Sequence, residues 1–479
     1  MVLISNFVQM ANAEKDKELE KIITSGGDER IWLQENHLNK YYSNPMQFEG
    51  VLNRGSCTCN TLTPDSKKRL DELLNTITDQ NFTQEVERLR EELKSMIDIA
   101  GEDKFELFFS PSGSELNYYP ILFSRLIHPG KEITSLITCP EELGSGSLKA
   151  ASGFSFSDYN QFDEFIGKGT PISEEIQIHV ETYAARDQEG KIIDHRQALI
   201  EKINTLPNSQ SLIGNLVIGS KSGIEDNVTI IPRIQKPVLW VVDMCQLRVP
   251  KNLINRLLDW DVMIMVTGSK FHQAPPFCGA LLVPKRILQM LRGPFDKDIV
   301  EPFTHIFSKY DIPPSLPGLR KHFRDFKNKG LLFRWEAALT EMQLIDDYDV
   351  TEVIEYIDLW NHTVIEAIHS YPETLELMPD TEATNKSIIS FRIKNKAGQY
   401  LNEPEMRRIY KEVVLNQHSG LGEYNKVLIG QPVSYNDRTF IRLALGSYPI
   451  RKFITEKFDP ERERRVVEII RDTALHLFG

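Results

Sequence analysis

The stretch VLWVVDMCQLRVPKNLINRLLDWDVMIMVTGSKF, residues 238–271, decides the fold class. Its two apolar runs, VLWVVD and VMIMVTG, are bounded by turn residues and separated by the helix-like PKNLINRLLDW. Strands that are apolar throughout are buried on both faces, which is typical of a parallel sheet covered by helices. Working outward, FELFF, ITSLITC, SLIGNLVIGS and CGALLVP are similar runs with helix-compatible segments between them. The alternation predicts an α/β fold with a mostly parallel sheet sandwiched by helices.

The chain divides into four segments that differ in composition and in hydrophobic pattern. Residues 1–100 read as a helical segment, with charged amphipathic periodicity over 66–97, that joins a smaller domain. Residues 101–295 are predicted to form the large α/β domain. The stretch 296–334 contains the Pro-rich DIPPSLPGLRKHF and is predicted to be a connection or lid. Helical and alternating patterns then mix over 335–479, which predicts a smaller C-terminal α+β domain.

Composition excludes several classes of protein. The 479 residues are 41% hydrophobic and 26% charged, which is ordinary for a globular chain of more than one domain. A net charge of −12 without a basic run disfavours general binding of nucleic acid or anionic membrane. Five cysteines without framework spacing argue against a disulfide scaffold, and the scattered histidines argue against a metal site. No apolar run approaches the length of a membrane span, and the N-terminus reads as an ordinary helix, so a cytoplasmic location is expected.

Polar residues that follow the apolar runs are the first candidates for chemistry. In an open parallel sheet ligands bind beyond the carboxyl ends of the strands. Asp243 ends one run, where it either caps a turn or holds a cationic ring nitrogen. Lys270 lies just past the next, where it is either an exposed loop lysine or an amine that forms a Schiff base. The turn SGSELN (112–117) leads into a helix-like segment and could direct backbone N–H groups at an anion.

Together these three features match what pyridoxal phosphate requires: an anion cradle, an acid for the pyridine nitrogen and a lysine for the aldehyde. The sequence resembles the fold type I pyridoxal-phosphate enzymes, within them the class V aminotransferase and cysteine desulfurase-like group. SGSELN resembles that group's phosphate turn, VVDMCQ (241–246) its D-x-x-Q, and TGSKF (267–271) its lysine segment. IGQPV (429–433) and FIRLALG (440–446) resemble its C-terminal arginine strand. The resemblance covers about residues 105–290 well and the first hundred residues poorly.

The resemblance implies a role for each matching residue. Lys270 would form the Schiff base with the cofactor, and Asp243 would pair with the pyridine nitrogen. Gln246 would lie near the ring hydroxyl, unless it is a plain polar residue after a strand. Arg442 would clamp the substrate α-carboxylate, a bidentate task suited to guanidinium, unless it is an exposed strand arginine. The phosphate would be held by four further residues: Gly113, Ser114, Thr267 and Ser269.

Some positions depart from the group's pattern. The group has S-x-H-K before its lysine, whereas here Ser269 precedes Lys270. The stretch TCPEELGSG (138–146) has no aromatic residue to stack on the ring, so Glu142 is the candidate there, unless it caps the following helix. In GSKSG (219–223), Ser220 and Ser222 are candidates to face the cofactor.

The N-terminal part offers a further set of candidates. Arg54 could meet an acidic substrate group or pair elsewhere on the protein. Cys57 and Cys59 lie in a segment that lines the substrate entrance in this fold, or are ordinary buried thiols. No cysteine follows Cys278, which disfavours a desulfurase that uses a mobile-loop cysteine.

The leading function is therefore an enzyme acting on an amino acid, first an aminotransferase. A lyase, decarboxylase or aldolase is the alternative, and a non-catalytic protein of the same fold is disfavoured because the lysine, the aspartate and the arginine are all present. A nucleotide-binding enzyme lacks its phosphate motif here. The resemblance also implies a homodimer with composite active sites, a small-molecule amino-acid substrate and no metal.

Overall fold

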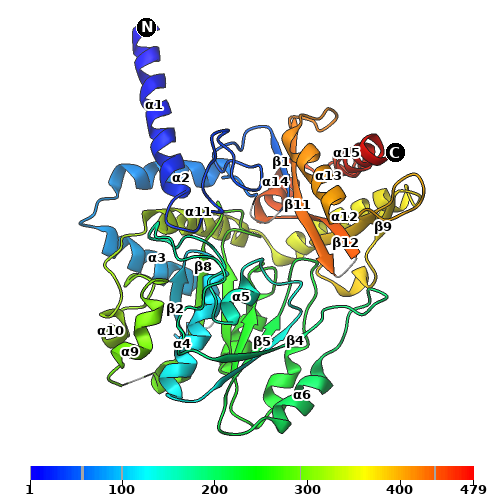
Figure 1. Cartoon of the computed structure of the whole chain (residues 1–479). Helices are drawn as coiled ribbons and strands as arrows, with labels where there is room; N and C mark the ends of the chain where they lie inside the picture. Colours follow the sequence, from blue (N-terminus) through cyan, green and yellow to red (C-terminus); the bar gives the residue numbers. More distant parts are fainter. Residues whose placement is uncertain (1, 56–58, 99–100, 292, 436–437) are drawn as a thin grey trace.

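The structure is a computed structural model that describes residues 2–55, 59–98, 101–291, 293–435 and 438–479, without the side chains of residues 2–11. Two sheets organise it (Figure 1). The seven strands of the large sheet run in the order β2 (Phe105–Ser110), β8 (Gly279–Pro284), β7 (Met263–Thr267), β6 (Leu239–Asp243), β5 (Ser211–Val217), β3 (Ile133–Thr138) and β4 (Ile178–Tyr183). Only β8 runs antiparallel to its two neighbours, so the other six strands end at one edge.

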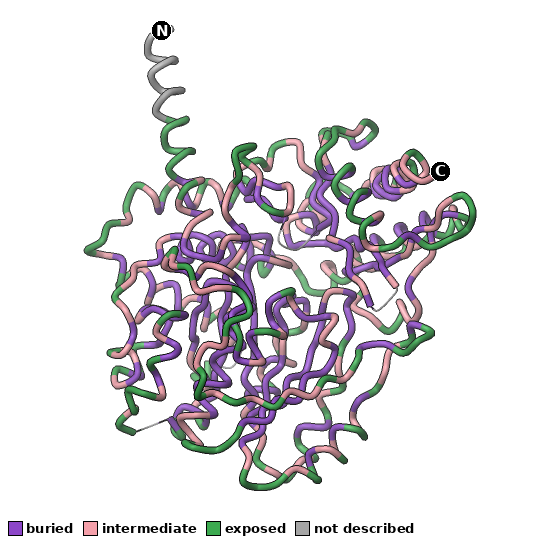
Figure 2. The backbone as a smooth tube through the Cα atoms, viewed as in Figure 1, coloured by how far each residue is buried: buried purple, intermediate pink, exposed green. Residues whose placement is uncertain are grey.

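The large sheet is buried on both faces, as its uninterrupted apolar strands predict. In β7, Ile264 and Val266 pack into one core and Met263 and Met265 into another. The first core is covered by α2 (Pro64–Thr76), α3 (Phe82–Ile97), α6 (Arg196–Thr205), α7 (Lys251–Asp259) and α11 (Lys329–Asp346). The second is covered by α4 (Tyr118–Ile127), α5 (Ser147–Ala151) and α8 (Lys285–Met290). Figure 2 shows the resulting purple interior at the sheet, ringed by exposed loops.

The smaller sheet has the order β1 (Val51–Arg54), β11 (Lys426–Tyr435), β12 (Arg438–Ala444), β10 (Ile388–Ile393) and β9 (Leu375–Leu377). Its helices are α12 (Val350–His369), α13 (Glu403–Leu415), α14 (Ser447–Glu456) and α15 (Pro460–Phe478), which share one core with it. The remaining short helices are η1 (Glu115–Asn117), η2 (Val228–Arg233) and η4 (Thr381–Ala383). The α/β class with a smaller α+β unit is confirmed.

The N-terminal hundred residues contribute to both units. Helix α1 (Val2–Ile23) enters the large core through Leu19 and Ile23, as do α2 and α3. Helix α2 begins sharply because Thr63 caps it, with a reciprocal bond to Ser66. The four residues of β1 instead pair in parallel with β11, as the edge strand of the smaller sheet.

The segment 296–334 connects the two units along the surface of the large sheet. It contains α9 (Lys297–Val300), η3 (Glu301–Phe303) and α10 (Pro317–Arg320). Phe303, Phe307 and Leu319 are fully buried in the core beneath it. This packing places the segment against the large sheet, and its role as a lid stays a prediction.

Candidate functional site

A cavity of about 320 Å³ lies where the carboxyl edge of the large sheet faces the smaller sheet. The size is within the roughly 300–1,000 Å³ of small-molecule sites. Eight residues singled out in the sequence line it: Gly113, Ser114, Asp243, Gln246, Thr267, Ser269, Lys270 and Arg442. Seven of them come together because β2, β6 and β7 end at the same edge, and Arg442 faces them from β12 of the smaller sheet.

The turn after β6 is ordered by its own aspartate. Oδ1 of Asp243 accepts a hydrogen bond from the backbone N–H of Cys245 at 2.9 Å. The carbonyl of Cys245 in turn accepts from Oγ1 of Thr267, at the end of β7, at 2.7 Å. Gln246 follows on the cavity wall, where its Oε1 accepts from Nε of Arg248 at 3.2 Å. These bonds set the spacing between the aspartate and the lysine segment.

The backbone of Lys270 is fixed while its side chain is not. Nδ2 of Asn60, from the N-terminal segment, donates to the carbonyls of Ser269 and Lys270 at 2.9 and 3.1 Å. Asn60 is itself held by Nδ2 of Asn53 at 2.9 Å. Within the described ranges, no residue makes a hydrogen bond or ion pair with Nζ of Lys270. The amine is therefore presented to the cavity from a rigid base.

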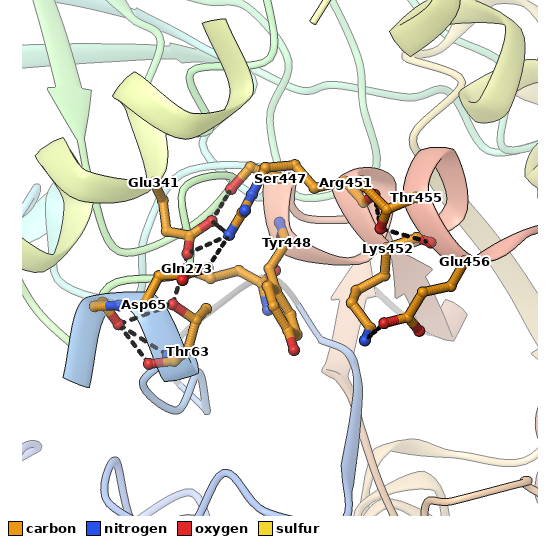
Figure 3. Close-up of polar contacts among 11 residues, drawn as sticks. Thr63, Asp65, Gln273, Glu341, Ser447, Tyr448, Arg451, Lys452, Thr455 and Glu456 are labelled. Atoms are coloured by element: carbon orange, nitrogen blue, oxygen red, sulfur yellow. Dashed lines mark hydrogen bonds and ion pairs between the residues drawn. The ribbon is translucent and has the colours of Figure 1, made fainter. Parts of the chain in front are cut away.

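The loop that follows Lys270 is tied to the smaller unit (Figure 3). Oε1 of Gln273 accepts from the backbone N–H of Tyr448 at 3.2 Å. Beside it the buried carboxylate of Glu341 accepts from Oγ1 of Thr63 at 2.5 Å and from Nη2 of Arg451 at 3.0 and 3.1 Å. Helices α2, α11 and α14 thus meet at one polar junction next to the lysine loop, which fixes the two units together at the site.

The turn after β2 forms the far wall of the cavity. A Cβ on Gly113 would lie 2.9 Å from Sγ of Cys245 and 3.0 Å from Cγ2 of Thr267, so only glycine lets this backbone approach the ends of β6 and β7. Oγ of Ser112 accepts from the N–H of Ser114 at 3.1 Å and donates to the carboxylate of Glu115 in a short bond. The hydroxyl and backbone groups of this turn converge as an anion cradle does.

Glu115 and Arg30 are buried beside this turn and were missed in the sequence. Burial, with the nearby charge of Asp28, raises the pKa of Glu115 to about 7, against the opposing effects of Arg30 and Ser112. Arg30 makes a two-bond ion pair with Asp28, at 2.6 and 2.7 Å, and Nη2 also donates to Oγ of Ser112 at 3.3 Å. No sequence signal marked Arg30, because it reaches the cavity from the N-terminal segment.

The guanidinium of Arg30 lies over two aromatic rings. It lies 4.4 Å from the ring centroid of Phe277 and 4.9 Å from that of Phe156. Stacking and the ion pair with Asp28 together fix its orientation at the cavity wall.

Arg442 projects into the cavity from β12. It pairs across the sheet with Gly430 of β11, where a Cβ would lie 2.2 Å from Cγ of Arg442. The glycine therefore makes room for the arginine side chain. Arg442 is 6% exposed, and its Nη1 is buried with no hydrogen-bond partner in the structure described. A buried donor without a partner is costly, which indicates that a ligand supplies the acceptor.

Lys221, in the turn after β5, also lines the cavity and was not singled out. Its Nζ donates to the carbonyl of Glu141 at 2.9 Å. Desolvation, followed by the charges of Arg442 and Lys270, lowers the pKa of Lys221 to about 8, although Glu142 and Asp243 oppose this. The stretch GSKSG was recognised as a candidate turn, but its serines rather than its lysine were proposed to face the ligand.

Those serines and Glu142 bind one another. The carboxylate of Glu142 accepts from Oγ of Ser220 at 2.6 Å, and from the N–H and Oγ of Ser222 at 2.7 and 2.5 Å. Neither Glu142 nor Ser222 is among the residues lining the cavity. The expectation that Glu142 lies over a bound ring is not supported, since its oxygens are engaged by the neighbouring turn. Small residues of the same loop line the cavity instead: Gly144, Ser145 and Ser147.

Arg54 lies outside the cavity, in a buried ion pair. Its Nε and Nη2 donate to both oxygens of Glu463 at 2.7 and 2.5 Å, and Nη1 donates to the carbonyl of Asn53 at 2.8 Å. The structure therefore does not bring Arg54 to a substrate. Cys57 lies outside the described residues, whereas Cys59 is buried, with its Sγ 3.6 Å from the carbonyl of Ile429.

The wall of the cavity formed by α13 carries an ion pair that faces solvent. Nη2 of Arg407 lies 2.5 Å from Oε1 of Glu403, whose Oε2 accepts from Oγ of Ser434 at 3.1 Å. Both charged side chains are about half exposed. They are placed to meet the outer end of a ligand.

A larger groove, of about 910 Å³, opens at the amino ends of β5 and β6. Lysines and aspartates such as Lys236 and Asp259 line it, but its described lining contains no glycine, and parallel-sheet ligands bind at the opposite edge. Among the described residues, no group of three or more His, Cys, Asp or Glu could hold a metal ion. In that same part of the chain, none of the helices has the length and apolar character needed to cross a membrane.

The sequence matches no protein-family model and no curated protein. Solved structures do match the fold. The chain is similar to ureidoglycine-glyoxylate aminotransferase from Bacillus subtilis, at 12% identity and a TM-score of 0.56, over 90% of this chain and 94% of that one. It is similar to phosphoserine aminotransferase from Cytophaga hutchinsonii, at 16% identity and a TM-score of 0.53, over 88% of this chain and 98% of that one. It is also similar to a NifS-like protein from Rickettsia africae, at 12% identity and a TM-score of 0.54, over 88% of this chain and 99% of that one. These neighbours confirm the fold expected from the resemblance.

Proposed function

We propose that the chain is a pyridoxal-phosphate-dependent enzyme that acts on an α-amino acid, as an aminotransferase. The observation that carries the proposal is the convergence of Lys270, Asp243 and the unpartnered Nη1 of Arg442 on one cavity, opposite the turn at Gly113. Lys270 would bind the aldehyde of the cofactor and Asp243 its pyridine nitrogen. Arg442 would bind the carboxylate of the substrate, and the turn at Gly113 the phosphate of the cofactor.

The donors and acceptors of the cavity fit this cofactor. Asp243 would hold the pyridine nitrogen, Gln246 would lie by the ring hydroxyl, and Lys270 would hold the cofactor covalently. The phosphate would be bound by hydroxyl and backbone groups of Gly113, Ser114, Thr267 and Ser269. Arg30 lines the cavity beside them. When bound, pyridoxal phosphate supplies an electron sink for the bonds at the α-carbon of an amino acid.

The residues of the chain would orient the substrate and move its proton. Arg442 would bind the α-carboxylate and so fix which bond at the α-carbon stands perpendicular to the ring. Lys270, just past the end of β7, would take a proton from the α-carbon and return it. The junction of Glu341, Arg451 and Gln273 would keep the two walls of the cavity at a fixed distance during this transfer.

Amino-group transfer is favoured over C–S cleavage by the residues present. Transfer needs nothing beyond the lysine and the carboxylate clamp, and two of the structural neighbours are named as aminotransferases. A NifS-like protein is also a neighbour, but this chain has no cysteine after Cys278 that could act near Arg442. A homodimer, a cytoplasmic location and the finer choice of amino acid stay predictions, the first of which sedimentation velocity would test.

The proposal is tested by the visible spectrum of the protein with pyridoxal phosphate. The wild type should become yellow, and borohydride should fix the cofactor to a peptide containing Lys270. After borohydride treatment, Lys270→Ala should carry no covalently bound cofactor, whereas Lys221→Ala should still be labelled at Lys270. The two variants together show which of the two cavity lysines binds the cofactor. A colourless protein, or label at Lys221, would refute the assignment.

A further inference from the structure

Two neighbouring cations in the cavity share no anion. Nη1 of Arg442 is buried and unpartnered, and Nζ of Lys221 has the neutral carbonyl of Glu141 as its hydrogen-bond partner. Both side chains line the same cavity, and Arg442 is the largest charge that lowers the pKa of Lys221. Like charges brought together in a partly desolvated wall cost free energy unless an anion lies between them.

The carboxylates near this pair are already engaged. Glu142 accepts three hydrogen bonds from Ser220 and Ser222, and Glu141 accepts one from the N–H of Ala185 at 3.1 Å. Asp243 accepts from the turn that follows it. None of the hydrogen bonds or ion pairs of the described residues joins these carboxylates to Lys221 or Arg442, so the anion has to come from a ligand.

The turn that carries Lys221 is built to hold it still. Ser220 and Ser222 flank the lysine and are both bound to Glu142, so the backbone on either side is fixed to the neighbouring loop. The bond from Nζ to the carbonyl of Glu141 uses one of the three ammonium hydrogens. Two donors remain for a ligand, and the position of the group is set before a ligand binds.

We propose that Lys221 and Arg442 bind one carboxylate together, and that this is the α-carboxylate of the substrate. The inference rests on the proposed function for the identity of the ligand, but the shared anion site follows from the two cations themselves. Lys221 is then a substrate-binding residue whose ammonium lies on one side of the carboxylate, with the guanidinium of Arg442 on the other.

Protonation of Lys221 makes this site sensitive to pH. The groups that face its ammonium are Arg442, Lys270, Glu142 and Asp243, and their net effect together with desolvation puts the pKa of Lys221 at about 8. An incoming carboxylate favours the charged lysine and raises that pKa. Carboxylate affinity is therefore full below pH 8 and falls as the free lysine loses its proton above it.

The test uses simple carboxylates and needs no turnover. Propionate and succinate are titrated by calorimetry into the purified protein, both as isolated and after loading with pyridoxal phosphate. The variant is Lys221→Gln. The matched control is Lys236→Gln, because Nζ of Lys236 also donates to backbone carbonyls, those of Ile203 and Leu206, but in the other groove.

We expect Lys221→Gln to weaken propionate binding about tenfold or more at pH 7, and Lys236→Gln to leave it unchanged. Wild-type affinity should fall between pH 7 and 9, while that of Lys221→Gln stays flat. Lys221→Arg should bind within a few-fold of the wild type and keep its affinity at pH 9, which guards against a folding defect in the glutamine variant.

Three results would overturn the shared site. The first is no saturable propionate binding by the wild type, and the second is equal binding by Lys221→Gln. The third is a loss confined to succinate, which would assign Lys221 to a second acidic group. If instead propionate binds as expected and no yellow holoprotein forms, the anion site stands and the proposed function fails.

Discussion

Two buried arginines of the smaller sheet differ in one respect. Arg54 on β1 is 1% exposed and donates three hydrogen bonds, two of them to Glu463, which also accepts from Nε1 of Trp360 at 3.0 Å. Arg442 on β12 is 6% exposed and leaves Nη1 unpartnered. Residue type, burial and sheet are shared. The difference teaches that the fold itself satisfies Arg54, whereas Arg442 keeps a donor that the substrate of the proposed function would satisfy.

The largest effect on stability is expected from removing the buried ion pair between Arg54 and Glu463. Arg54→Met should lower the free energy of unfolding by about 3–5 kcal/mol, because it leaves the carboxylate of Glu463 buried and uncompensated. Urea denaturation at pH 7 measures this. The double variant Arg54→Met, Glu463→Leu should recover a large part of the loss. A single variant as stable as the wild type would show that the pair is not structural.

Arg442→Met should give the opposite pattern. Its stability should equal or exceed that of the wild type, because an unpaired buried charge is removed. Loss of a charged partner to the substrate should reduce kcat/KM for an amino donor roughly 10²–10³-fold, as expected for about 2.7–4 kcal/mol. Steady-state kinetics of the holoenzyme and urea denaturation test the two halves separately. Destabilisation like that of Arg54→Met would place Arg442 among the structural charges.

Glu115 lies between these extremes, since it has partners but keeps a pKa raised to about 7 from 4.5. Folding therefore binds a proton between these values, and stability declines as pH rises from 4.5 to 7. Glu115→Gln should lack this decline and gain on the order of 3 kcal/mol over the wild type at pH 8. The free energy of unfolding at pH 5 and pH 8 measures the difference. A wild type and variant with parallel pH profiles would contradict the assignment to Glu115.

The exposed pair at the cavity mouth should matter least to stability. Arg407 and Glu403 are about half exposed, and such pairs contribute roughly 0.2–1 kcal/mol. Arg407→Gln should therefore change the free energy of unfolding by less than about 1 kcal/mol, while Lys411→Gln on the same helix serves as the control. A larger effect would mean that the pair fixes α13 to β11 through Ser434.

The sequence predicts the strand-end part of the site for a geometric reason. Asp243, Thr267 and Gly113 follow apolar strands, and parallel strands bring their carboxyl ends to one edge, so local pattern is enough to place them. Arg442 was placed by resemblance, since the alternation of β12 alone does not say which face meets the cavity.

The remaining site residues depend on contacts that no local pattern records. Arg30 lines the cavity from the N-terminal segment, and Asn60 of the same segment holds the carbonyls of Ser269 and Lys270, more than two hundred residues away along the chain. Glu142 is held away from the cavity because the turn after β5 supplies three donors to it, and Lys221 of that turn lines the cavity instead. The strand β1 is four residues long and gains its stability from β11, so its own composition is weak evidence for it.

The pairing of β1 with β11 has a consequence for synthesis on the ribosome. Val51 leaves the exit tunnel before its sheet neighbour, Lys426, which emerges 375 residues later. The large sheet ends at Pro284 and is complete well before that. Domains fold in the order in which they are made, so β1 waits as an unpaired edge while the large unit forms. The cavity is complete only after the segment with Arg442 and Glu463, the carboxylate that binds Arg54, has been made.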